Sequence, residues 1–86
     1  MINNNLDALR EYIYFLEQSV KELERYREEI MQYLSILNNH WEDIKYNEFK
    51  EKLTYLEKIE NELELYIIAV ISRLKELEIK LERYLR

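Results

Sequence analysis

Apolar residues recur at alternating spacings of three and four along two long stretches of this 86-residue sequence. The first stretch runs from Leu6 to Leu37, the second from Tyr46 to Tyr84, and a short segment without the pattern separates them. The alternation is typical of a coiled-coil seam, in which each helix buries one stripe of side chains against another helix. The sequence contains no Gly and no Pro, which favours long helices. We therefore predict an all-α fold.

Each stripe carries one charged residue at a seam position. When the chain is folded at its middle, residues equally distant from the middle face each other, and Arg27 then faces Glu60. We predict an ion pair between them, which would set the register of an antiparallel two-helix hairpin at some cost in stability. The alternative is that each charged group extends to solvent independently. The predicted seams are Leu6, Leu9, Ile13, Leu16, Val20, Leu23, Arg27, Ile30, Leu34 and Leu37, and Tyr46, Phe49, Leu53, Leu56, Glu60, Leu63, Ile67, Val70, Leu74, Leu77, Leu81 and Tyr84.

Polar residues between the two stretches predict the turn. Asn38 and Asn39 tolerate the left-handed conformation that commonly ends a helix. The second helix is capped either by Asn39 with Glu42 three residues later, or by Asp43 in its own first turn, and both options stay open. We predict a single domain over residues 1–86, with a first helix over about 5–38, a turn over about 38–43 and a second helix over about 43–85.

Apolar residues outside the two seams exceed what a two-helix hairpin can bury. One explanation is that they widen an ordinary core, since Tyr can bury its ring and keep its hydroxyl hydrated. We favour a second interface, through which two hairpins pair into a four-helix bundle. The residues predicted for this interface are Tyr12, Phe15, Tyr26, Tyr33, Tyr55, Ile59, Tyr66, Ile68 and Ile71.

The charge pattern disfavours nucleic acid and membrane partners. The net charge is −5, and acidic and basic residues are interspersed along the chain without a basic block. No apolar run approaches the ~20 residues that a membrane-spanning helix needs. The first residues lack the basic and apolar regions of a cleavable signal peptide. We expect a protein that is made in the cytoplasm, has a helical protein partner or pairs with itself, and does not insert into membranes.

Residues with catalytic or ligand-binding chemistry do not form a recognisable motif. The sequence has no Cys, and without Gly it cannot form a phosphate-binding loop. His40 is the only histidine and has no companion ligands for a metal. A two-helix rod also offers no concave site. We expect neither enzymatic activity nor a metal or cofactor.

Trp41, Asp43, Tyr46 and Phe49 form a W-x-D-x-x-Y-x-x-F pattern around the predicted turn. This pattern resembles the WXG (ESAT-like) superfamily of type VII secretion proteins, in which a Trp-x-Gly turn joins two antiparallel helices. Asp43 stands where the family name has Gly, a form that resembles the divergent small helical partners of LXG-domain toxins. Family members pair, as homodimers or heterodimers, into four-helix bundles.

These residues also have physical roles that do not depend on the resemblance. A Trp at the end of a hairpin can fill the open space between the helices, as we expect for Trp41. Asp43 can satisfy free N–H groups at the start of the second helix. Phe49 is expected to continue the seam.

The resemblance implies a small partner protein, acting as a targeting factor or chaperone, that binds the helical N-terminal region of a toxin-like substrate and aids its export. The family's secretion motif places Asp or Glu four residues after Tyr, and no Tyr of this sequence has an acidic residue there. The implied role is that of a partner for a substrate that carries the signal, with co-secretion requiring no cleavable signal peptide. The alternative is a self-associating structural coiled-coil adaptor with no role in secretion.

Overall fold

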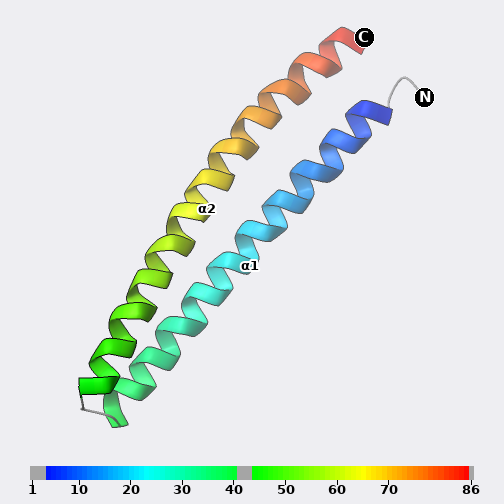
Figure 1. Ribbon diagram of the computed structural model, residues 1–86. Helices are drawn as coiled ribbons and strands as arrows, with labels where there is room; N and C mark the ends of the chain where they lie inside the picture. Colours follow the sequence, from blue (N-terminus) through cyan, green and yellow to red (C-terminus); the bar gives the residue numbers. More distant parts are fainter. Residues whose placement is uncertain (1–3, 41–43, 86) are drawn as a thin grey trace.

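The computed structural model describes residues 4–40 and 44–85, and each range is a single helix. Helix α1 spans Asn4–His40 and helix α2 spans Ile44–Leu85. The two helices lie antiparallel and side by side, with both ends of the chain at one end of the molecule (Figure 1). The predicted all-α hairpin is confirmed. The turn residues Trp41 and Asp43 lie outside the described residues.

The molecule is a rod of 64 × 15 × 13 Å. A helix of 42 residues with a rise of 1.5 Å per residue is about 63 Å long, so α2 alone accounts for the long dimension. Asp7 in the first turn of α1 and Arg83 in the last turn of α2 each complement the helix dipole.

Helix α1 ends two residues later than predicted. Asn38 and Asn39 are helical, and no described residue has a positive φ. The prediction that these residues end the first helix is therefore wrong. An existing helix gains one hydrogen bond for each residue added, and the low helix propensity of Asn does not outweigh this gain here.

The hydrophobic core is concentrated near the chain ends. We call residues 4–22 with 65–85 the terminal half and residues 23–40 with 44–64 the turn half. Ile13, Val20 and Ile71 form the buried cluster, and all three lie in the terminal half. Among the described hydrophobic residues of the turn half, only Tyr46 is buried, and its hydroxyl donates a hydrogen bond to the Leu34 carbonyl oxygen at 3.3 Å.

Helix α1 presents its predicted seam to α2, whereas α2 presents a different stripe to α1. Every predicted seam position of α1 is buried or partly buried. On α2, the predicted seam residues Phe49, Leu56, Leu63, Leu77 and Tyr84 are exposed. Glu57, Glu64, Ile71, Glu78 and Leu85, each one residue further along the chain than a predicted seam residue, are all buried or partly buried.

The exchange of stripes means that α2 is rotated about its own axis, relative to the predicted orientation, by roughly 50°. Tyr46, Leu53, Glu60, Ile67, Leu74 and Leu81 belong to both stripes and stay in the seam. The rotation places Ile71 in the core and turns Leu56 and Leu63 outward.

The buried cluster predicts where truncation destabilises the hairpin. Ile13 is 4% exposed and Ile79 is 51% exposed. Ile13→Ala should lower the free energy of unfolding by about 2–4 kcal/mol because it opens a cavity, and Ile79→Ala should change it by less than about 1 kcal/mol. Urea denaturation followed by circular dichroism measures both. Equal losses for the two variants would contradict the placement of the core.

Candidate protein-protein interface

Ion pairs between the helices lie along one side of the hairpin, which we call the ion-pair face. Arg10 and Glu17 follow seam positions of α1 by four residues, so they lie on the same flank of that helix. Each pairs with a residue of α2 on the matching flank. The pairs that define the face are Arg10 with Glu78 at 2.9 Å, Arg10 with Glu82 at 3.6 Å, Lys75 with Glu17 at 3.7 Å and Arg27 with Glu64 at 2.8 Å.

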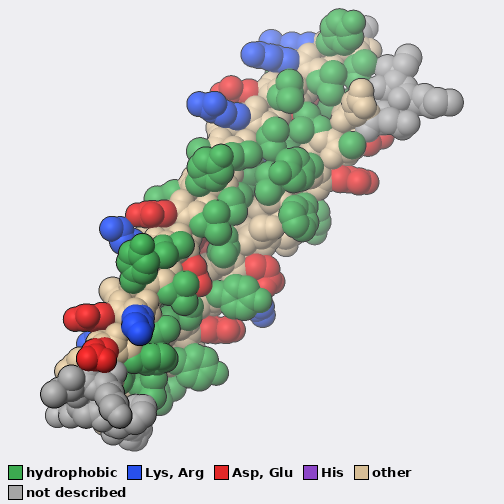
Figure 2. Space-filling view, in the orientation of Figure 1, with side chains coloured by type: hydrophobic (Ala, Val, Ile, Leu, Met, Phe, Trp, Pro, Cys, Tyr) green, Lys and Arg blue, Asp and Glu red, His purple; other side chains and the backbone are tan. Residues whose placement is uncertain are grey.

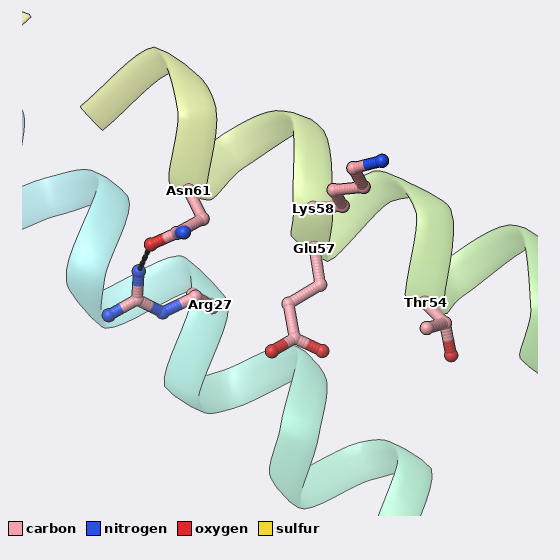
Figure 3. Close-up of a pocket in the computed structure, with 5 residues that line it drawn as sticks. All are labelled: Arg27, Thr54, Glu57, Lys58 and Asn61. Carbon is pink, nitrogen blue, oxygen red and sulfur yellow. Dashed lines mark hydrogen bonds between the residues drawn. The ribbon is translucent and has the colours of Figure 1, made fainter. Parts of the chain in front are cut away.

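Arg27 pairs with Glu64, one turn beyond the predicted partner Glu60. Its Nη1 donates to Glu64 Oε2 and to Asn61 Oδ1, both at 2.8 Å. Figure 3 shows the Arg27 side chain reaching from α1 to Asn61 on α2. The predicted Arg27–Glu60 pair is wrong. Side chains lean toward the N-terminus of their own helix, so facing residues of antiparallel helices lean apart, and long side chains meet partners one turn away.

Glu60 remains in the seam, and no described Lys or Arg forms an ion pair with it. Its Oε2 atom is covered and has no hydrogen-bond partner. Glu60 as a residue is only partly buried, so part of its side chain remains exposed in the hairpin. A buried carboxylate oxygen without a partner is costly, and this position is the least satisfied one in the described seam.

Glu64 is only 7% exposed, and its environment opposes ionisation. Burial raises the pKa of the Glu64 carboxyl above its ordinary value. A hydrogen bond and charge repulsion from Glu24 add to the rise, and the positive charge of Arg27 opposes it only in part. Glu64 therefore lies in an environment that favours its neutral form, although Arg27 donates a hydrogen bond to its Oε2.

The opposite side of the hairpin is rich in exposed apolar residues, and we call it the apolar face. Tyr12, Tyr26 and Tyr33 of α1 lie on the flank away from Arg10 and Glu17, and the displaced leucines of α2 lie on the flank away from Glu64 and Glu78. Figure 2 shows hydrophobic side chains of both helices along the length of the molecule. The exposed residues that define this face are Tyr12, Phe15, Tyr26, Tyr33, Ile36, Phe49, Tyr55, Leu56, Ile59, Leu63, Tyr66 and Leu77.

The predicted interface residues divide between the two faces. Seven of them, Tyr12, Phe15, Tyr26, Tyr33, Tyr55, Ile59 and Tyr66, are exposed and belong to the apolar face. Ile68 and Ile71 do not, because they line a groove on the ion-pair face together with Val20. Ile71 in addition is buried in the core. For Ile71 the prediction is wrong, since the rotation of α2 brings this residue into the core. Ile68 is 44% exposed but lies on the flank of α2 away from Tyr66.

Sequence reasoning missed the most apolar part of the face. Leu56, Leu63 and Leu77 were assigned to the seam because they match its spacing, yet they are exposed. Phe49, expected to continue the seam, is half exposed. A signal was present in the sequence: Glu57, Glu64, Ile71 and Glu78 repeat every seven residues, which places acids where α1 offers Arg10 and Arg27.

The accessible surface shows how much area the hairpin leaves uncovered. The chain exposes 7344 Å², whereas a compact monomeric protein of 10.8 kDa exposes about 5,500 Å². The excess of about 1,800 Å² exceeds the roughly 800 Å² that each partner buries in a typical stable interface. The hairpin thus exposes more surface than a compact monomer of its mass, by an amount that is large enough for an interface of typical size.

Grooves, metal-ligating groups and the apolarity of the helices also bear on function in the described part of the chain. An open groove lies between the helices at Arg27, with Thr54, Glu57, Lys58 and Asn61 at its borders (Figure 3). Residues 4–40 and 44–85 contain no group of three or more His, Cys, Asp or Glu side chains able to hold a metal ion. Neither described helix has a stretch that is long and apolar enough to cross a membrane.

Comparisons of this chain with protein-family models, with curated proteins and with solved structures found no match. The assignment of a function therefore depends on the apolar face and on the sequence pattern at the turn.

The pKa of Glu64 makes stability depend on pH. As pH rises, Glu64 ionises first in the unfolded chain and only later in the folded chain, so the unfolded chain then binds fewer protons and stability falls. The side chain of Gln cannot ionise, so the Glu64→Gln variant does not lose stability in this way as pH rises. The free energy of unfolding of the variant minus that of the wild type should therefore increase from pH 4 toward neutral pH, beginning near the ordinary Glu pKa of about 4.3. Urea titrations across this range measure it, and a flat or decreasing difference would contradict the assignment.

Proposed function

We propose that this protein is a helical-hairpin partner that covers its apolar face with two helices of another protein and completes a four-helix bundle. The observation that carries the proposal is the exposure of Leu56 and Leu63, which lie in the most apolar stripe of α2, on the same face as Tyr26 and Tyr33. Full burial of one Leu side chain stabilises an assembly by about 1.5–3 kcal/mol. In a four-helix bundle, a helix contacts two neighbours and buries a stripe of this width.

The sequence pattern around the turn supports a role in type VII secretion. Trp41, Asp43, Tyr46 and Phe49 resemble the turn region of the WXG superfamily, and the small Trp-x-Asp members of that family accompany LXG-domain toxins. On this proposal the partner is the helical N-terminal region of a toxin-like substrate. Burial of the apolar face stabilises both proteins and completes the surface that the secretion machinery binds, while the substrate supplies the export signal.

Substitutions of two nearby leucines that lie on different faces of α2 test the proposal. Leu63 on the apolar face is 46% exposed, and Leu65, two residues further along α2 and pointing away from that face, is 58% exposed. Leu63→Glu should weaken binding to the helical N-terminal region of an LXG-domain toxin by about 30-fold or more, because a carboxylate would be buried in the interface. Leu65→Glu should bind within about threefold of the wild type.

The measurement is co-purification of the two proteins, followed by titration calorimetry with each variant. Circular dichroism of both variants controls for loss of helix. Equal binding of the two variants would exclude the apolar face as the contact surface. A tight homodimer that does not bind the toxin region would instead favour the structural adaptor.

A further inference from the structure

Glu60 lies directly beside the apolar face. It follows Leu56 by four residues and precedes Leu63 by three, so the two exposed leucines flank it on the same side of α2. A partner that covers Leu56 and Leu63 must therefore also cover the part of Glu60 that the hairpin leaves exposed. Burial of a charge without a counter-charge is strongly unfavourable.

Among the described residues, no Lys or Arg forms an ion pair with Glu60. Arg27 is the one cation at a seam position, and its Nη1 is engaged by Glu64 and Asn61 at 2.8 Å each. Glu64, which engages Arg27, also has Glu24 beside it, and burial and Glu24 together raise the pKa of the Glu64 carboxyl. The Glu60 Oε2 atom has no hydrogen-bond partner.

A second copy of this chain is poorly matched to this face. Two copies would bring two Glu60 carboxylates into one apolar interface, each with its seam arginine already engaged. They would also join two chains that each carry a net charge of −5. A partner with the opposite charge at this level removes both difficulties.

We propose that the partner is a different protein, whose apolar helix is interrupted at mid-length by a Lys or Arg that pairs with Glu60. This inference rests on the proposed bundle and specifies the chemistry of its partner. A single buried polar pair within an apolar seam fixes register and partner choice, as one polar seam residue does in coiled coils. Glu60 is then a specificity-determining residue of the apolar face.

The test uses three designed helical hairpins as probes, identical except for one central residue of a leucine stripe, which is Lys, Gln or Glu. Fluorescence anisotropy gives the Kd of each probe for the full-length chain. The wild type should bind the Lys probe at least tenfold more tightly than the Gln probe, and the Glu probe most weakly. Glu60→Gln should bind the Lys and Gln probes equally, and Glu60→Lys should prefer the Glu probe.

Glu62→Gln is the matched control, because Glu62 is exposed and lies about 200° around α2 from Glu60. It should keep the tenfold preference of the wild type, and circular dichroism should show unchanged helix content in all variants. If the wild type binds the three probes equally, the proposed pairing is wrong and the proposed bundle is not affected. If no probe binds, the apolar face is not a docking surface, and the proposed function falls with it.

Sedimentation velocity of the chain alone tests the second copy as the occupant. The wild type should be monomeric at low micromolar concentration, and Glu60→Leu should strengthen self-association at least tenfold because it removes the unpaired charge. A submicromolar wild-type dimer that Glu60→Leu leaves unchanged would overturn the proposal and identify a second copy as the occupant of the face.

Discussion

The apolar stripe of α2 is wider than one neighbouring helix can cover, and the rest of the structure depends on how this excess is distributed. The hairpin directs Ile71 and the acids at positions 64 and 78 toward α1, and leaves Leu56 and Leu63 outside. Burial of these leucines against α1 would turn Glu64 and Glu78 away from Arg27 and Arg10. The observed rotation therefore keeps the ion pairs and exposes the leucines, which another chain can bury.

This distribution divides the rod into two unequal halves. The terminal half holds the buried cluster, in which Ile13 and Val20 pack against Ile71. The turn half is held by polar contacts of Arg27 and by the buried ring of Tyr46, whose hydroxyl bonds to the Leu34 carbonyl. A cooperative unit with few buried apolar contacts contributes little to global stability. Most of the intrinsic stability of the hairpin thus comes from the half that carries both chain ends.

The polar residues of the turn half suit a protein that selects its partner. A buried or half-buried ion pair such as Arg27 with Glu64 adds little net stability after desolvation, and its better-attested role is to define register. Glu60 lies beside the apolar face, and its Oε2 atom has no hydrogen-bond partner. By the same argument, Glu60 would define the register of the proposed assembly. Affinity would come from the leucines and tyrosines of that face, and specificity from the charge among them.

The sequence by itself determined the helix count, the antiparallel arrangement and the buried stripe of α1, because that helix has one continuous seam with a single charged residue, Arg27. It could not determine the orientation of α2, which has two overlapping stripes sharing residues such as Leu53 and Ile67. Periodicity evaluates one helix at a time, and the choice depended on side chains of the other helix, above all Arg10 and Arg27. Only the tertiary structure could therefore decide which leucines remain outside and that Arg27 pairs with Glu64 and not with Glu60.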